Sequence, residues 1–299
     1  MVIRDPRAKD HLLGVRRDHL HASRGWPCAS PACDSTQGLT VALTIGTWNV
    51  QWQFGEWEAR QPAILQVLRN LDADVVMLQE SWRGQVERFA SELGYHSTWA
   101  GHNPHADPER SMGNAILSRW PIQTRAHRFL ADSQGREYRT ILSARVNTPF
   151  GILPAFTTHL DYHFDGSATR LAQLATASEF IEEHASGELP PILTGDLNAV
   201  HDSDEIRKLT GRSAPYVAGR IWTDAWEQVG DGPGITWSKA NPYINNSAWP
   251  NRRLDYVMIG WPREKRPLGN PQRAWMFGIE PIDGVVGSDH YGVAVEIHT

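Results

Sequence analysis

The chain has 299 residues, of which 40% are hydrophobic and 21% are charged, and its mean hydropathy is -0.44. This composition supports a buried core. Because the sequence holds no apolar run of about 18 residues and no signal-like apolar stretch at its start, we expect a cytoplasmic protein without stable membrane association. The net charge of -5 excludes the strongly basic character of proteins that coat nucleic acid, although a single basic face is compatible with it.

Strand signals follow one another along most of the chain as short apolar runs bounded by turn residues. In chain order they cover residues 41–50, 74–80, 113–119, 136–146, 151–160, 190–200, 253–259 and 290–297. Helix signals, with apolar residues at helical spacing, cover residues 58–71, 84–94, 167–185 and 202–209. We expect Asp202 and Glu205 to cap the last of these helices. Helices mixed with neighbouring strands predict an α/β (α+β) sandwich with mixed or antiparallel sheets.

Residues 1–40 show no sustained periodicity, and we interpret them as an N-terminal extension that is poorly ordered. The two cysteines of the chain, Cys28 and Cys33, lie in this extension and match no zinc-binding spacing, so we expect incidental thiols in a reducing compartment. Residues 41–299 contain no dividing linker, which predicts a single domain.

Polar residues occur where the predicted strands end. They are Asn49, Glu80, His159, Asp196 and Asn198, and Asp289 and His290 stand in the turn before the last strand. Strands aligned in one sheet place such ends along a common rim, where ligands tend to bind.

The residue types at this rim suit phosphate chemistry. Glu80, Asp196 and Asp289 offer hard oxygen ligands, and together with Asn49 they suit one Mg²⁺ ion. His159 and His290 suit hydrogen bonding to phosphate oxygens or proton transfer, and Asn198 suits orientation of an oxygen without added repulsion. No cysteine or nucleophile-elbow serine accompanies the set, which favours direct attack by an activated water.

Seven segments together resemble the endonuclease/exonuclease/phosphatase superfamily. They are TWN at 47–49, LQE at 78–80, GNAILSR at 113–119, THL at 158–160, GDLN at 195–198, RRLDYVMI at 252–259 and GSDHYGV at 287–293. The resemblance covers about 250 residues from Val41 onward and makes residues 41–299 the catalytic domain. It implies a four-layer sandwich of two mixed β-sheets packed face to face, with helices on the outside.

The resemblance also implies a role for each residue. Asn49, Glu80 and Asp289 resemble the metal-binding residues, which bind Mg²⁺ and also suit Mn²⁺. The catalytic set comprises Asp196 for the attacking water or leaving group, Asn198, His159 and His290 for the phosphate, and Asp255 for the tautomer of His290. Arg170 and Gln173 match a further family pattern, for which we expect a structural role. Whether Asp196 or His290 takes the proton of the water, and whether one metal ion or two are bound, stays open.

The substrate is less well determined by the sequence. A nuclease or nucleic-acid phosphodiesterase is our first interpretation, and four motifs also match the tyrosyl-DNA phosphodiesterase branch. A hydrolase of lipid head groups or small phosphate esters is the alternative, and an inactive binding protein is the third, although no named residue is missing.

Two segments bear on this choice. Trp237, Tyr243 and Trp249 precede Asp255 and suit either stacking on bases or packing of their own loop. The residues Arg263, Lys265, Arg266 and Arg273 suit either contact with a phosphate backbone or a solvated connection.

Overall fold

A computed structural model describes residues 42–299 apart from residues 132–133, 137, 245–247 and 262–267. The predicted N-terminal extension with Cys28 and Cys33 lies outside the described residues, as do Arg263, Lys265 and Arg266. The residues from Leu39 onward form one compact unit. Among the described residues, no helix has the length and apolar character that crossing a membrane requires.

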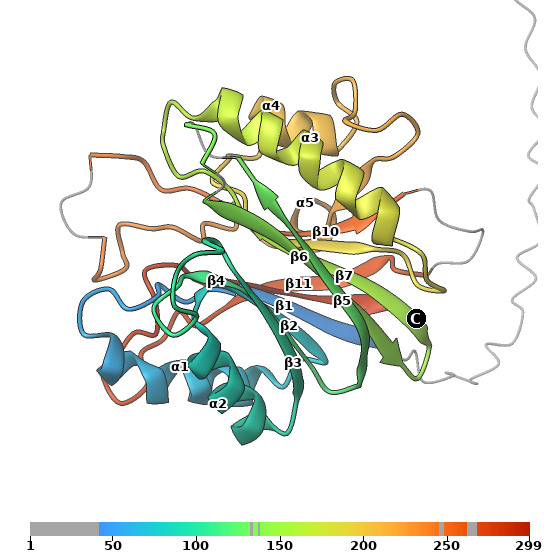
Figure 1. The fold of residues 1–299 in the computed structure, drawn as a ribbon. Coiled ribbons are helices and arrows are strands. Elements are labelled where there is room, and N and C mark those ends of the chain that lie inside the picture. Colours follow the sequence, from blue (N-terminus) through green and yellow to red (C-terminus); the bar gives the residue numbers. More distant parts are fainter. Residues whose placement is uncertain (1–41, 132–133, 137, 245–247, 262–267) are drawn as a thin grey trace, which may run out of the picture. The chain divides into compact units, whose positions relative to one another are not determined.

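The strands of this unit form two mixed six-stranded sheets (Figure 1). In spatial order, the first sheet contains β11 (Pro271–Phe277), β12 (Gly292–His298), β1 (Ala42–Asn49), β2 (Val75–Ser81), β4 (Gly113–Ser118) and β3 (His96–Gly101). The second contains β5 (Ile122–Leu130), β6 (Arg139–Thr148), β7 (Gly151–His159), β8 (Ile192–Asp196), β10 (Asp255–Gly260) and β9 (Trp222–Asp224). In each sheet one central pair is parallel, namely β1 with β2 and β7 with β8.

Helices cover the outer faces of both sheets, which produces the four layers visible in Figure 1. The helices α1 (Trp57–Leu71) and α2 (Arg83–Leu93) pack on the first sheet. The helices α3 (Ser167–His184) and α4 (Asp204–Leu209) pack on the second, and the short α5 (Ala225–Val229) contacts β10 and β11. The structure confirms the predicted four-layer sandwich.

Alternation along the strands divides the apolar residues between three cores. In β1, for example, Leu43 and Ile45 face the second sheet, whereas Trp48 packs under α1. In β8, Ile192 faces inward and Leu193 packs under α3. Because side chains of a strand alternate between its faces, every second residue of such a strand points into the space between the sheets.

The sequence patterns missed the strands β3, β5, β9 and β11 and the helix α5. Of these, β5 and β3 are edge strands with mostly polar or half-exposed residues, so they lack the apolar runs that marked the other strands. The predicted cap of α4 is also wrong. Ser203 precedes this helix, and the buried Glu205 instead accepts a hydrogen bond from Arg170 at 2.8 Å.

Candidate active site

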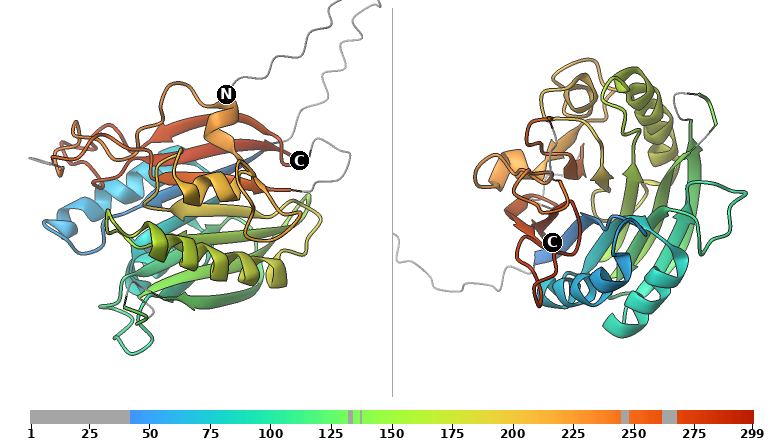
Figure 2. Two further views of the ribbon diagram at one scale, coloured as in Figure 1. Left: turned by 90° about the horizontal axis from the view of Figure 1, so that it is seen from above. Right: turned by 90° about the vertical axis from the view of Figure 1, so that its left-hand side faces the viewer.

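The predicted site residues meet at one end of the sandwich, which the right-hand view of Figure 2 faces. The parallel strands β1 and β2 run side by side to Asn49 and Gln79, and β7 and β8 run side by side to His159 and Asp196. Antiparallel β10 begins at Asp255, directly opposite Asp196. Both sheets therefore contribute strand ends to the same rim.

Strand alternation turns most of these side chains toward the space between the sheets. Asn49 shares a face with Leu43 and Ile45, and Asp196 shares one with Ile192. The space between the two sheets is filled by apolar side chains in its interior and by polar side chains toward the rim. There Gln79 Nε2 of the first sheet donates to Thr157 Oγ1 of the second at 2.8 Å. Gln79 is fully buried and was not singled out from the sequence.

Glu80 reaches the rim through an irregularity in its strand. Strict alternation would place it on the helix side of the sheet with Val76 and Leu78. Its φ of 55° lies in the left-handed region, and the register with β4 breaks between Leu78 and Ser81. Such a bulge re-aims a side chain at a cost of about 1–3 kcal/mol, and backbone strain of this kind concentrates at functional sites.

The turn after β8 positions Asp196 and Asn198. Gly195 has a φ of 144°, and a Cβ there would lie 1.9 Å from the Thr158 carbonyl oxygen, so β7 and β8 approach each other at a position that requires glycine. Asn198 has a left-handed φ of 48°, and its N–H donates to Asp196 Oδ1 at 3.0 Å. Its side-chain Nδ2 donates to the Leu160 carbonyl, which fixes the loop after β7.

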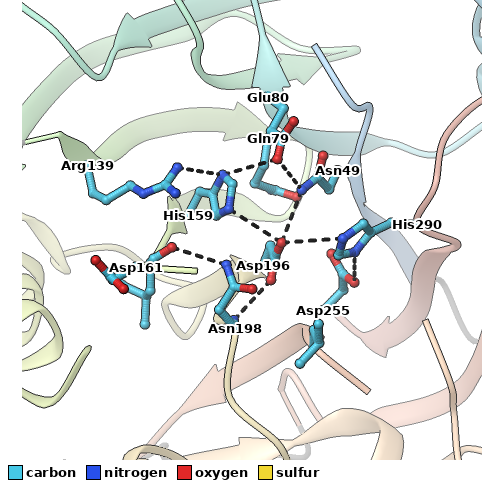
Figure 3. Close-up of polar contacts among 12 residues, drawn as sticks. Asn49, Gln79, Glu80, Arg139, His159, Asp161, Asp196, Asn198, Asp255 and His290 are labelled. Atoms are coloured by element: carbon cyan, nitrogen blue, oxygen red, sulfur yellow. Dashed lines mark hydrogen bonds and ion pairs between the residues drawn. The ribbon is translucent and has the colours of Figure 1, made fainter. Parts of the chain in front are cut away.

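Asn49 connects the acidic groups of the two sheets (Figure 3). Its Nδ2 donates to Glu80 Oε1 at 3.1 Å and to Asp196 Oδ2 at 3.0 Å. Its Oδ1 accepts from the Gln51 N–H at 3.0 Å. The amide NH₂ thus brings partial positive charge between the two acids.

The pKa values of these acids are raised. Burial raises the pKa of Glu80 to about 7, and the neighbouring Asp289 adds to the effect. Burial also raises the pKa of Asp196 to about 6; the charge of His290 opposes this increase and that of Asp255 adds to it. The positive groups at this rim therefore do not fully offset the cost of burying the ionised Glu80 and Asp196 carboxylates.

His290 is held by Asp255. The His290 Nδ1 lies 2.9 Å from Asp255 Oδ2, and its Nε2 lies 3.7 Å from Asp196 Oδ2. Burial would lower the pKa of His290, but the carboxylates of Asp255 and Asp196 outweigh burial and raise it well above the ordinary value. The raised pKa favours the imidazolium form of His290, with its Nδ1–H donated to Asp255.

His159 has the opposite character, because Arg139 lies beside it. Arg139 Nη1 approaches His159 Nδ1 at 3.2 Å, so this nitrogen accepts the hydrogen bond. His159 Nε2 lies 3.5 Å from Asp196 Oδ2, which fits an Nε2–H tautomer. Burial, Arg139 and nearby histidines hold the pKa of His159 well below its ordinary value, so the ring is neutral. The sequence did not indicate Arg139, because it stands in the polar segment at the start of a predicted strand, where arginines are usually exposed.

A cavity of about 420 Å³ opens over these groups, and we call it the catalytic cavity. Its lining includes Glu80, Arg139, His159, Asp196, Asn198, Asp289 and His290, together with Phe54, Met112, Tyr162, Phe164, Trp237, Arg252 and Leu254. Most of the predicted residues therefore line one cavity, while Asn49 and Asp255 lie buried beneath them.

Buried Arg60 holds the loops around this cavity, and no pattern in the sequence indicated it. Its guanidinium donates to the carbonyls of Val50, Gln51, Trp52, Phe54 and Gly287. It thereby joins the loop after β1 to the turn that carries Asp289 and His290. Arg170 and Gln173 act similarly, because both hydrogen-bond the backbone of Asp161 in the loop after β7.

The aromatic residues predicted near the site have different positions. Trp237 lines the catalytic cavity, whereas the Tyr243 ring lies under the Arg60 guanidinium and its hydroxyl donates to the Val286 carbonyl. Trp249 stacks on Phe164 with ring centroids 3.7 Å apart, and the Arg252 guanidinium lies 4.0 Å from the centroid of Phe164. Arg273 does not line this cavity; it lies 4.0 Å from Glu296 on the edge pair of the first sheet.

Two groups of residues could hold a divalent metal. Asp196, Asp255 and His290 offer ligand atoms within 4.8 Å of one another. Asp255 and the Nδ1 of His290 already satisfy each other, which disfavours this group. Glu80, with Asn49 beside it, and Asp289 are hard oxygen donors; burial and then the charge of Asp289 raise the pKa of Glu80, and this donor set fits Mg²⁺.

Comparison with known proteins agrees with this geometry. The sequence profile of the Endonuclease/Exonuclease/phosphatase family matches residues 46–290. The protein YbhP of Escherichia coli (strain K12), itself described as uncharacterized, is 27% identical over 286 residues, which cover 89% of this chain and 99% of YbhP.

Two solved structures share the fold over 86% of this chain and 99% of their own. One is D. rerio TDP2 complexed with single strand DNA product, at 23% identity and a TM-score of 0.68. The other is the endonuclease/exonuclease/phosphatase from Bacteroides vulgatus, at 17% identity and a TM-score of 0.68. The fold and its rim of acids and histidines are those of a phosphoesterase, a hydrolase of phosphate esters. The chain belongs to the Endonuclease/Exonuclease/phosphatase family.

Proposed function

We propose that this protein is a Mg²⁺-dependent phosphodiesterase that cleaves nucleic acid by in-line attack of water on phosphorus. The observation that carries the proposal is the junction of the two sheets, where Asn49 bridges Glu80 and Asp196 beneath an open cavity. Raised carboxyl pKa values and a protonated histidine at one rim suit catalysis of phosphate hydrolysis.

Glu80 and Asp289 would hold the metal ion, together with Asn49 once its amide is turned so that Oδ1, and not the NH₂ group, faces Glu80. When bound, a divalent cation neutralises charge on the phosphoryl group and on the leaving oxygen. Mn²⁺ suits the same oxygen donors. The donors of the chain that face the phosphate are protonated His290, neutral His159 through its Nε2–H, Asn198 and Arg139.

Asp196 is the group that fits the role of base. The carboxylates of Asp255 and Asp196 raise the pKa of His290 against the effect of burial, which favours the imidazolium, a form with no lone pair to accept a proton. The pKa of Asp196, about 6, leaves its carboxylate mostly ionised at neutral pH but more basic than an ordinary aspartate. The proton of the attacking water thus passes to Asp196, while His290 remains a charged hydrogen-bond donor to the phosphoryl oxygens.

Exposed aromatic side chains beside the catalytic cavity support nucleic acid as the substrate class. Phe164 and Trp249 stack on each other and remain nearly half exposed, at 46% and 45%. Tyr162, which also lines the catalytic cavity, is 61% exposed. Aromatic faces of this kind stack on unpaired bases, and the structurally similar TDP2 of D. rerio was crystallised with a single strand DNA product.

A substrate panel tests the proposal. The purified chain is assayed with Mg²⁺ or Mn²⁺ against single-stranded DNA, duplex DNA, RNA, sphingomyelin and bis-p-nitrophenyl phosphate. We expect metal-dependent cleavage of nucleic acid and of the generic diester, reduced at least about 10³-fold by Asp196→Asn. Asp202→Asn, at an exposed position outside the cavity, is the matched control and keeps full activity.

Each other outcome has a defined meaning. Cleavage of sphingomyelin, and not of nucleic acid, would identify lipid head groups as the substrate class. Cleavage of bis-p-nitrophenyl phosphate alone would identify small phosphate esters as the substrate class. Absence of metal-dependent hydrolysis across the whole panel would refute the catalytic proposal and favour a binding protein.

A further inference from the structure

A second cavity of about 420 Å³ adjoins the catalytic cavity, and we call it the flanking cavity. The two cavities share Met112, Arg139 and Tyr162. The lining of the flanking cavity comes from the segment between β3 and β4, from residues just before β6 and from the loop after β7. A substrate bound at the catalytic rim therefore has direct access to it, and its volume is typical of small-ligand sites.

The flanking cavity is positively charged. Arg110, Arg136 and Arg139 line it, and Asp161 is the only carboxylate among the described residues of its lining. One oxygen of the Asp161 carboxylate is already paired, because its Oδ1 accepts from the His163 N–H and lies 2.9 Å from His163 Nδ1. An anion in this cavity therefore meets more cationic than anionic side chains.

His102 provides an independent sign of a missing ligand. The residue is only 5% exposed, and it lines the flanking cavity. Neither ring nitrogen has a hydrogen-bond partner among the described residues. A buried polar group without a partner destabilises the fold, so it needs a compensating partner.

The protonation of His102 defines what that partner offers. Burial, and then the charge of Arg139, hold the pKa of His102 well below its ordinary value. The ring is therefore neutral at physiological pH and carries one N–H donor. A phosphate oxygen accepts such a hydrogen bond and at the same time satisfies the nearby arginines.

Another cavity that adjoins the catalytic cavity differs in charge. A third cavity shares Phe164, Asn198 and Arg252 with the catalytic cavity. Its lining includes Asp165, Asp204 and Glu205 against Arg170 and Arg252, and Arg170 is already paired with Glu205. Of these two cavities, the flanking cavity is therefore the better environment for an additional negative group of a substrate.

We propose that the flanking cavity binds a second phosphate of the substrate, adjacent to the one that is hydrolysed, through Arg110, Arg139 and His102. This inference rests on the proposed function and narrows it. The preferred substrate carries at least two phosphates along its backbone, as an oligonucleotide or a phosphorylated nucleotide end does. An isolated phosphate ester leaves the flanking cavity unfilled.

Equilibrium binding tests this inference without turnover. The Asp196→Asn protein is titrated in a calorimeter with thymidine 5′-monophosphate, thymidine 3′-monophosphate and thymidine 3′,5′-bisphosphate in the presence of Mg²⁺. We expect the bisphosphate to bind about tenfold more tightly than either monophosphate, as one charge-assisted phosphate contact allows. Raising the salt concentration should reduce this difference.

Two variants in the same background locate the contact. Arg110 is exposed, so Arg110→Gln leaves the fold intact and should remove most of the preference for the bisphosphate. Arg88→Gln, at an exposed arginine on α2 that lines none of these cavities, should retain it. The ring ¹⁵N resonances of His102 should shift on addition of the bisphosphate more than on addition of the monophosphates.

Several outcomes overturn the inference. They are equal affinities for mono- and bisphosphate, an equal loss in Arg88→Gln and Arg110→Gln, or His102 resonances that do not respond. Failure of the proposed function is a separate result, since it would appear as absence of diester hydrolysis by the unmodified chain. The affinity comparison decides about the flanking cavity in either case.

Discussion

Replacement of Asp255 by asparagine isolates the charge that holds His290. The amide keeps the size of the side chain and retains an oxygen that accepts from His290 Nδ1–H, but the substitution removes the negative charge 2.9 Å from the ring. Asp255 and His290 are almost completely buried, with side-chain exposures of 0% and 7%, so solvent screens their interaction very little. The pKa of His290 should therefore fall, because burial is then opposed by fewer charges.

The expected loss of stability in Asp255→Asn follows from the contribution of the Asp255 charge to its hydrogen bond with His290. A hydrogen bond between charged groups stabilises a fold by about 1.5–3 kcal/mol, and a neutral replacement retains part of it, so we expect a loss of about 2 kcal/mol. For a domain of this size that corresponds to a decrease in Tm of about 4–8 °C, which leaves the protein folded. A neutral His290 also stops donating a charged hydrogen bond to the transition state, which should lower kcat about 10²- to 10³-fold at pH 7.

The pH profile separates this effect from general damage. His290 acts as a protonated group, so activity is lost as pH rises through its pKa, and a lower pKa moves this loss to lower pH. We therefore expect the pH optimum of Asp255→Asn to shift toward acid, with part of the activity recovered there. Asp283→Asn, at an exposed turn, serves as the control. An unchanged profile, or a His290 titration by NMR that matches the unmodified protein, would refute the assigned role of Asp255.

Three further perturbations have defined outcomes. Gly195→Ala should lower stability by about 3 kcal/mol or more in thermal melts, because the added Cβ would clash with Thr158. Gly219→Ala, also at positive φ but in open space, should lower it by about 1 kcal/mol. Equal losses would contradict the close contact between Gly195 and Thr158. Arg60→Met should lower the free energy of unfolding in urea by about 3–4 kcal/mol, against less than about 0.5 for Arg69→Gln at an exposed ion pair. Burial and Asp289 raise the pKa of Glu80, so stability from the protonated form is present below its ordinary pKa and is lost as pH rises through about 7. The increase in Tm caused by Mg²⁺ should therefore be larger at pH 8 than at pH 6, and an increase that is independent of pH would argue against Glu80 as a ligand.

Much of the site was predictable because its residues follow apolar strands in a fixed relation. Asn49, His159 and Asp196 lie on the inward face by simple alternation with Ile45, Ala155 and Ile192. A sequence shows both the apolar run and the polar residue that ends it, so it also shows that these side chains share a rim. The fold class followed from the same strands, whose central members are buried on both faces.

Other features depend on contacts that no local pattern shows. Glu80 would face the helices if β2 were regular, and its left-handed conformation is visible only in the folded chain. Arg60 and Gln79 stabilise the site through partners distant in sequence, such as Gly287 and Thr157. Arg139 is likewise defined by its approach to His159 and not by its place in a polar segment.

The site belongs jointly to both sheets, and this explains how a protonated and a neutral histidine can both lie next to Asp196. The second sheet supplies Asp255, whose carboxylate keeps His290 of the first-sheet rim protonated. It also supplies Arg139, whose charge keeps His159 neutral. Asp196 lies between the two rings, with its Oδ2 3.5 Å from His159 Nε2 and 3.7 Å from His290 Nε2. Asp196 can therefore accept the proton of the attacking water, while His290 donates hydrogen bonds as a cation and His159 donates as a neutral ring. This division of roles requires both sheets, which the hydrogen bond from Asn49 to Asp196 joins.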